Sequence, residues 1–290
     1  MNTALDITSG AVFMGSGLSR VALGRNDEAG EAGLPAVIDR GSMLETRDLT
    51  IRFGGHVAVD AVSCAFSPGS LTAIVGPNGA GKTTYFNLIS GQLRPTAGQV
   101  IFAGADITRM PASARARQGL GRAFQLTNLF PHLSARENVR LAVQSRRRAG
   151  LDLFRTWTSH VELIEEAEDV LDQVALRERR HVAAGLLPHG DQRKLEVAIL
   201  LALHPTIFMF DEPTAGMSVD EVPVILDLIN EIKARGDTTV LLVEHKMDVV
   251  RSLADRIIVL HNGKLVADGE PAGVIASPVV QEAYLGIANV

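Results

Sequence analysis

A chain of 290 residues, 46% apolar and 21% charged, is long enough to bury a sizeable core in one large domain or two small ones. The formal net charge of −5 argues against a broad nucleic-acid-binding surface, and the basic run at Arg146, Arg147 and Arg148 is interpreted as a solvated helix end. No run approaches the roughly eighteen apolar residues of a membrane-spanning helix, and the single cysteine, Cys64, excludes an internal disulfide and fits a reducing compartment such as the cytosol.

Residues 1–42 differ in composition from the rest of the chain. They are rich in Gly, Ser and Ala, show no sustained hydrophobic period, and begin with an acidic charge that is atypical of a signal peptide. We therefore expect residues 1–42 to form a flexible N-terminal extension and residues 43–290 to form the folded domain.

Strand-like apolar runs dominate the start of this domain. They predict strands at residues 43–51, 57–66, 71–75 and 99–102. The first two are joined by a turn at Gly54 and Gly55, and a helix is predicted over residues 81–90.

The middle of the chain is predicted to be helical. Capping-box spacing at Ser134 and at Ser159 predicts the start of two helices. Residues from about 127 to 186 are therefore interpreted as a helical insertion, which is followed by a further helix at 192–203.

Strands and helices alternate in the last part of the chain. Strands are predicted at residues 206–210, 238–243, 257–260 and 265–267. A capping box at Ser218 predicts a helix that ends at Gly236, and Asn262-Gly263 predicts a hairpin turn. This alternation predicts an α/β fold with a mixed, mainly parallel sheet and an antiparallel piece at the start.

A glycine-rich segment between the strand at 71–75 and the following helix has the pattern of a phosphate-binding loop. Its glycines let backbone N–H groups surround the phosphates of ATP, and the helix dipole adds to the attraction. Lys82 is expected to reach the β- and γ-phosphates, and the Thr83 hydroxyl to bind Mg²⁺. The predicted ATP-binding residues of this phosphate loop are Gly76, Pro77, Asn78, Gly79, Ala80, Gly81, Lys82, Thr83 and Thr84.

Two adjacent carboxylates, Asp211 and Glu212, follow the apolar strand at 206–210. Ligands bind at the carboxyl edge of open α/β sheets. We predict that Asp211 holds Mg²⁺ through its water shell and that Glu212 accepts a proton from the attacking water. Such a pair alone is typical of an ordinary loop or helix cap, but the upstream phosphate loop favours the catalytic interpretation.

Taken in this order over residues 43–290, the motifs resemble the ATP-binding cassette (ABC) ATPases of transporters, a P-loop NTPase fold with an inserted helical subdomain. The resemblance implies that Phe53 stacks on adenine, although a Phe at this place could equally be a core residue. It implies that Gln125 joins the sheet to the helical subdomain and contacts Mg²⁺ or water, and that His245 contacts the γ-phosphate.

The resemblance also implies a signature segment that acts on ATP held by a second cassette. It would consist of Leu187, Pro188, His189, Gly190 and Asp191. Pro188 stands where the commonest family pattern has Ser, His189 replaces Gly and Asp191 replaces Gln. These departures are similar to those of one branch of the family, the ATPases of branched-chain amino acid importers.

The expected function is therefore ATP hydrolysis in an importer for branched-chain or other hydrophobic amino acids, with ATP and Mg²⁺ as ligands. The resemblance implies several partners: a second ABC ATPase subunit, identical or different, two membrane permease subunits, and an extracytoplasmic substrate-binding protein. It implies a place at the cytoplasmic face of the cell membrane, and the net charge argues against a nucleic acid partner.

Three alternatives remain at the level of the sequence. The first is the ATPase of a urea or amide importer or of a lipopolysaccharide exporter, since these share parts of the same pattern. The second is a soluble ABC ATPase of DNA repair or translation. The third is a binding module without turnover, which Glu212 argues against because binding alone needs no general base.

Overall fold

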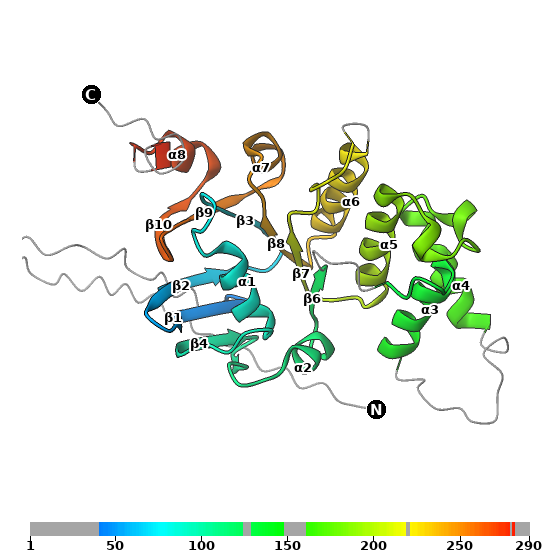
Figure 1. The fold of residues 1–290 in the computed structure, drawn as a ribbon, viewed down its shortest axis with the longest axis horizontal. Helices are drawn as coiled ribbons and strands as arrows, with labels where there is room; N and C mark the ends of the chain where they lie inside the picture. The colour runs from blue at the N-terminus through cyan, green and yellow to red at the C-terminus, as the bar shows by residue number, and fades with distance from the viewer. Residues whose placement is uncertain (1–40, 124–128, 148–160, 219–220, 279, 282–290) are drawn as a thin grey trace, which may run out of the picture. The chain divides into compact units, whose positions relative to one another are not determined.

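The computed structural model describes residues 41–123, 129–147, 161–218, 221–278 and 280–281. The described residues form one compact unit with two sheets and two groups of helices (Figure 1). The predicted N-terminal extension, 1–42, lies almost wholly outside the described residues and stays a prediction. None of the helices in the described ranges is both long and apolar enough to cross a membrane.

One sheet is antiparallel and has four strands in the order β2-β1-β4-β5. Its strands are β1 (Leu44–Phe53), β2 (His56–Phe66), β4 (Ala97–Phe102) and β5 (Ala105–Asp106). The predicted hairpin is confirmed, since Phe53 pairs with His56 across the turn at Gly54 and Gly55. The buried Cys64 of β2 donates its N–H to the Thr46 hydroxyl, 3.1 Å away.

The second sheet has six strands in the order β10-β9-β3-β8-β7-β6. They are β3 (Leu71–Val75), β6 (Leu120–Ala123), β7 (Ile207–Asp211), β8 (Thr239–Val243), β9 (Arg256–His261) and β10 (Lys264–Gly269). All pairs are parallel except the antiparallel edge strand β10. Every residue of β3, β7 and β8 is buried, which explains their continuous apolar runs.

Helices lie in the connections between the parallel strands, as such pairing requires. They are α1 (Lys82–Ser90), α2 (Ala112–Arg117), α6 (Val222–Ala234) and α7 (Met247–Leu253), and a further helix, α8 (Pro271–Ala276), follows the last strand. The apolar side of α1 shares one core with both sheets, which includes Phe66 of β2 and Met209 of β7. This packing fixes α1 between the sheets and leaves its N-terminus at the carboxyl end of β3.

Arg115 of α2 anchors the C-terminus of α1. Its guanidinium is 1% exposed and donates to the carbonyls of Leu88 and Ile89 at 2.8 and 2.6 Å, and to those of Thr108 and Met110. The carbonyls of Leu88 and Ile89 lie in the last turn of α1, where helix carbonyls need partners from outside the helix. Burial lowers the pKa of Arg115 to about 10, and the four acceptors satisfy the charge within the fold.

The second group of helices consists of α3 (Ala135–Arg146), α4 (Val161–Gln173), two single turns at Arg177–Arg179 and Ala184–Leu186, and α5 (His189–Ala202). The predicted cap of α3 is confirmed, because the Ser134 hydroxyl accepts the N–H of Glu137. Ser159 lies outside the described residues. Helix α5 packs against both α3 and α4, so the helical region extends beyond residue 186.

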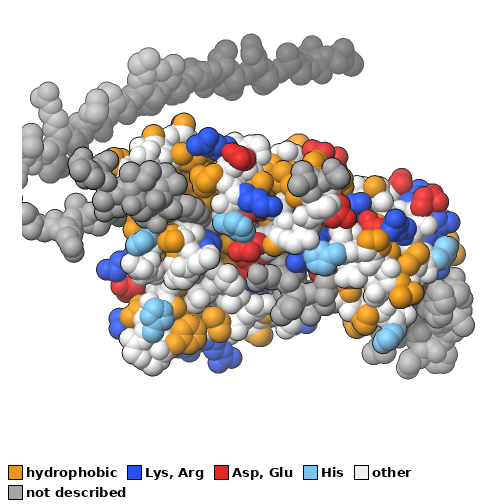
Figure 2. Space-filling view, turned by 45° about the horizontal axis from the view of Figure 1, so that its top comes forward, with side chains coloured by type: hydrophobic (Ala, Val, Ile, Leu, Met, Phe, Trp, Pro, Cys, Tyr) orange, Lys and Arg blue, Asp and Glu red, His pale blue; other side chains and the backbone are white. Residues whose placement is uncertain are grey.

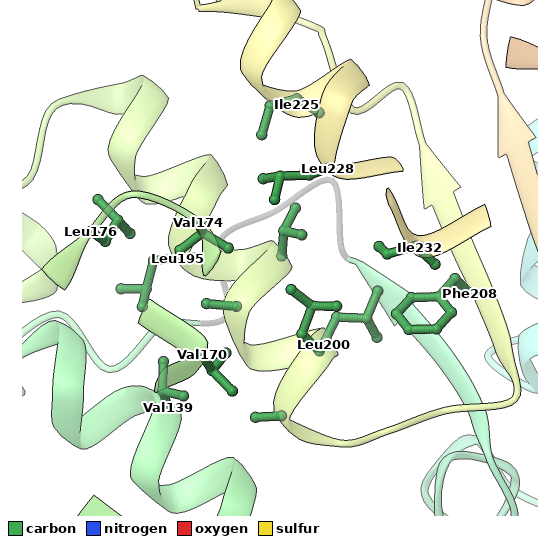
Figure 3. Close-up of a cluster of buried hydrophobic side chains, with 14 of the residues drawn as sticks. Val139, Val170, Val174, Leu176, Leu195, Leu200, Phe208, Ile225, Leu228 and Ile232 are labelled. Atoms are coloured by element: carbon green, nitrogen blue, oxygen red, sulfur yellow. The ribbon is translucent and has the colours of Figure 1, made fainter. Parts of the chain in front are cut away.

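A shared apolar core joins this region to the parallel sheet (Figure 3). Val139 and Val170 come from α3 and α4, Leu195 and Leu200 from α5, and Phe208 from β7. Helix α5 therefore packs against the sheet on one side and against α3 and α4 on the other.

The predicted start of the helix after β7 is wrong. Ser218 does not cap it; α6 begins at Val222, and Glu221 occupies the capping position. The Glu221 carboxylate accepts the N–H of Ser218 at 3.1 Å, so only the acidic half of a capping box is formed. Pro223 in the first turn fits this later start, because a proline there loses no helical hydrogen bond.

Candidate functional site

The phosphate loop lies between β3 and α1, and two of its glycines are required by the backbone around it. A Cβ atom on Gly76 would lie 2.2 Å from the Leu260 carbonyl oxygen, and one on Gly81 would lie 2.4 Å from that of Ala58. Gly81 also has φ +98° at the start of α1. The loop is therefore pressed against β9 and β2, with its tip at Asn78 and Gly79 exposed.

Lys82 is held inside its own loop. Its Nζ donates to the carbonyl oxygens of Gly76 at 2.7 Å and Pro77 at 3.1 Å. Burial lowers the pKa of the Lys82 ammonium below its ordinary value, while Glu212 and Asp211 oppose that shift. The ammonium is thus already surrounded by oxygen acceptors, and phosphate oxygens of a nucleotide could replace them.

Asp211 is the last residue of β7 and is buried beside a second charge. Its Oδ2 lies 2.8 Å from Nη2 of Arg122, and the two side chains are 0% and 7% exposed. Its Oδ1 is buried and has no hydrogen-bond partner among the residues that the structure describes. Burial raises the pKa of the Asp211 carboxyl, and the attraction of Arg122 works against that shift.

Arg122 of β6 was not predicted as a site residue. Its Nη1 donates to Asn87 Oδ1 at 2.6 Å, Ser90 Oγ at 2.9 Å and Gln92 Oε1 at 3.1 Å, all at the C-terminal end of α1. Its guanidinium lies 5.4 Å from the centre of the Phe86 ring. Its proximity to Gln125 in sequence is the one signal that could have drawn attention to it.

Glu212 has a strained backbone. Its φ is +50°, which costs a non-glycine residue roughly 1–3 kcal/mol. Its N–H donates to the Val243 carbonyl of β8 at 2.9 Å, which helps to hold this conformation. The predicted general base therefore leaves β7 at a defined angle, and its side chain is only partly buried.

His245 follows β8, and its imidazole lies beside the Glu212 carboxylate. Its Nδ1 is 3.8 Å from Glu212 Oε1 and 3.7 Å from Glu244 Oε2, and its side chain is 51% exposed. Glu244 is fully buried; it accepts the N–H groups of His245 and Lys246 and the hydroxyl of Thr214. Glu244 thus joins the segment after β7 to the segment after β8.

Two predicted site residues lie at the margin of this arrangement. Phe53 is 49% exposed at the end of β1, which excludes the alternative that it is a core residue. It pairs with His56 on the same β2 strand that passes the phosphate loop at Ala58. Gln125 lies outside the described residues; β6 ends at Ala123, two positions before it.

The signature segment forms the N-terminus of α5, so the predicted helix start at 192 is wrong. Pro188 occupies the capping position, and His189, Gly190 and Asp191 form the first turn. Pro188 and His189 are exposed, whereas Asp191 is buried and pairs with Arg179 and with Lys194.

Gly190 of the signature segment cannot be replaced without a shift nearby. A Cβ there would lie 1.9 Å from the Glu221 carboxylate at the start of α6. The absence of a side chain lets α5 and Glu221 meet directly.

The oxygen atoms of the site fit a hard divalent cation. They include the exposed Thr83 hydroxyl and the unpartnered Oδ1 of Asp211. No cluster of three or more His, Cys, Asp or Glu suited to a metal occurs within the described ranges. Mg²⁺ is commonly held by one or two carboxylates together with phosphate oxygens of the substrate.

A family model described as ABC transporter matches residues 59–215, which contain the phosphate loop, the signature segment and both carboxylates. The chain belongs to this family. The predicted P-loop cassette fold is confirmed by a crystal structure of an ATP-binding cassette of an ABC transporter in its ADP conformation. That structure matches with a TM-score of 0.73 and 30% identity over 84% of this chain and 99% of the other.

Similar proteins of known annotation share most of this cassette. BraF of Pseudomonas aeruginosa and LivG of Escherichia coli K12, both high-affinity branched-chain amino acid transport ATP-binding proteins, are 38% and 36% identical, over 85% of this chain and 98% of each relative. The lipopolysaccharide export ATP-binding protein LptB of Acidithiobacillus ferridurans is 34% identical over 84% of this chain and 97% of LptB. The cassette is accordingly a nucleotide-binding, ATP-hydrolysing member of the family.

Proposed function

We propose that this cassette hydrolyses ATP to drive an importer of branched-chain or other hydrophobic amino acids. The observation that carries the proposal is the 38% identity to BraF over 98% of that protein's length. The described site supports it, because the residues that hydrolysis requires converge at one edge of the parallel sheet.

The chain's own groups divide the work of hydrolysis. The phosphate loop and Lys82 bind the β- and γ-phosphates, with Lys82 exchanging its bonds to Gly76 and Pro77 for phosphate oxygens. Glu212 accepts the proton of the attacking water, and His245, 3.8 Å away, contacts the γ-phosphate.

Magnesium is the proposed cofactor, and Thr83, Asp211 and Gln125 would hold it. The ion would neutralise phosphate charge when it is bound. The fit rests on the oxygen donors and on the buried, unpartnered Oδ1 of Asp211.

A second cassette, identical or different, is the proposed first partner. Pro188 and His189 are exposed at the N-terminus of α5, and the helix dipole there favours an anionic group. This placement supports a signature segment that acts on the phosphates held by the other cassette.

Two membrane permease subunits are the proposed second partners, gripped by the helical region. Phe130, Leu133 and Leu186 are 57%, 37% and 80% exposed. Backbone bonds from Ala184 to Leu133 and from Gly185 to Pro131 bring their segments side by side. We propose that this apolar surface meets the permeases at the cytoplasmic face of the inner membrane, with a substrate-binding protein on the other side.

Nucleic acid is not a proposed partner. Figure 2 shows acidic and basic side chains interspersed over the described part of one face, without a broad basic field. The absence of a nucleic acid partner stays an expectation from the formal net charge of −5.

Purification of the chain from its own cells tests the proposal. We expect it to fractionate with membranes and to co-purify with permeases, and we expect its deletion to abolish uptake of labelled leucine. ATP turnover should be much higher in the assembled complex than in the isolated chain. A soluble chain whose turnover is independent of permeases would contradict a transport role.

The similarity to LptB favours one second candidate, an exporter of lipopolysaccharide. In that case leucine uptake would survive the deletion and lipopolysaccharide would fail to reach the cell surface. Uptake of labelled urea tests the corresponding alternative importer in the same strain.

A further inference from the structure

We propose that Arg122 is a positioning residue for magnesium: it holds one oxygen of Asp211 so that the other faces the ion. The inference rests on the proposed binding of Mg²⁺-ATP. It goes beyond the predicted site, because Arg122 itself belongs to none of the nucleotide motifs.

The two oxygens of Asp211 have different surroundings. Oδ2 lies 2.8 Å from Arg122 Nη2, whereas Oδ1 is also buried and has no partner within the described part of the chain. A buried carboxylate oxygen without a partner is costly unless a ligand satisfies it. The ion pair therefore selects which oxygen remains available for a cation or its water.

The Arg122 side chain is itself held in place by hydrogen bonds from its second terminal nitrogen, Nη1. Nη1 donates to Asn87, Ser90 and Gln92, and the guanidinium lies over the Phe86 ring. These four residues belong to α1 or follow it directly. Because α1 also carries Thr83, Arg122 ties the positions of two predicted magnesium ligands together.

A lysine could not reproduce this arrangement. The guanidinium is planar and presents Nη1 and Nη2 to different partners at once, whereas an ammonium is a single point charge. Arg122→Lys keeps the charge beside Asp211 but loses the bridge to α1.

The experiment compares nucleotide binding with and without magnesium in the full chain. A fluorescent ATP analogue is titrated in EDTA and then at increasing Mg²⁺. For Arg122→Lys we expect about a tenfold or greater rise in the Mg²⁺ concentration at half-maximal binding, the usual effect of losing a partner of a metal ligand. Binding in EDTA should change less than twofold.

Arg115→Lys is the matched control. Arg115 is also a buried arginine at the C-terminal end of α1, but its acceptors are carbonyls and none belongs to the site. This variant should lower the melting temperature and leave the Mg²⁺ requirement within twofold of wild type. An equal change in Mg²⁺ requirement in both variants would overturn the proposal, as would none in Arg122→Lys.

Asn87→Ala is a milder variant that decides the matter if Arg122→Lys does not fold. It removes one acceptor of Nη1 and leaves the ion pair with Asp211 intact. We expect a two- to threefold rise in the Mg²⁺ requirement, and an unchanged requirement would count against Arg122. If the wild-type chain itself shows no magnesium-dependent binding, the proposed function fails, which is distinguishable from failure of this inference.

Discussion

The nucleotide side and the signature segment of this cassette differ in how much of each is held by contacts within the chain. On the nucleotide side, buried charges have partners within the chain: Lys82 bonds to its own loop, Asp211 to Arg122, and Glu244 to three donors. At the signature segment, Asp191 is likewise buried and paired with Arg179 and Lys194, but Pro188 and His189 are exposed. A site that binds its ligand with groups of one chain can form all its supporting contacts when that chain folds. A surface that contacts another chain must remain exposed until that chain binds.

The largest effect is expected for a substitution on the nucleotide side, at the predicted general base. Glu212→Gln should keep ATP affinity and slow hydrolysis by roughly 10²–10⁴-fold, because a positioned general base is lost. Phosphate release by the purified transporter, together with ATP titration, checks both parts. Near-normal turnover would show that another group takes the proton.

Lys82→Ala should weaken ATP binding by about 10–100-fold, the range for losing a charge-assisted hydrogen bond. Titration calorimetry of the isolated chain at fixed Mg²⁺ measures it. Lys194→Ala is the control, because Lys194 is a cation of the signature helix, 3.2 Å from Asp191. Lys194→Ala should leave the affinity for ATP unchanged. If both variants lost affinity equally, the two regions would not differ in their part in ATP binding.

Gly190→Ala should act only in the assembled complex. The new Cβ displaces the Glu221 carboxylate, so we expect turnover of the transporter to fall about tenfold, or about 1.4 kcal/mol. ATP binding by the isolated chain should not change. Adding Glu221→Ala removes the clash and should restore part of the turnover; no recovery would place the defect elsewhere.

The smallest effect is expected for Asp191→Gln, which restores the commonest residue of the family. It removes the pairs with Arg179, which is 50% exposed, and with Lys194. The Arg179 partner is half exposed and the Lys194 pair joins residues three apart on one helix, so the two pairs together contribute about 1 kcal/mol and the melting temperature should fall by no more than a few degrees. A larger loss in a thermal melt would show that Asp191 organises the start of α5.

Sequence patterns predicted most of the strands well because their signals are local. The run at 71–75 is fully buried as β3, and the run at 206–210 forms β7, which ends at Asp211. Strand β6 was missed because Leu120, Gly121, Arg122 and Ala123 show neither an apolar run nor alternation. Its strand character comes from pairing with β7, which is distant in sequence.

The signature helix and Arg122 show a second limit. Pro188 and Gly190 indicate a loop locally, yet α5 begins at His189 because its apolar face packs on α3 and α4. Arg122 acquires its role only through Asp211, 89 positions away. Contacts of this kind depend on the assembled sheet and leave no pattern around the residue itself.

The burial of Cys64 has a practical consequence for following this cassette in motion. Its thiol is 5% exposed, and burial raises its pKa to about 11, so little reactive thiolate forms at neutral pH. It is also the only cysteine in the chain. A single cysteine introduced at an exposed position such as Leu186 could therefore carry a spectroscopic label without removal of the native one. Distances between labels on two cassettes would then report how far apart they stand before and after nucleotide is added.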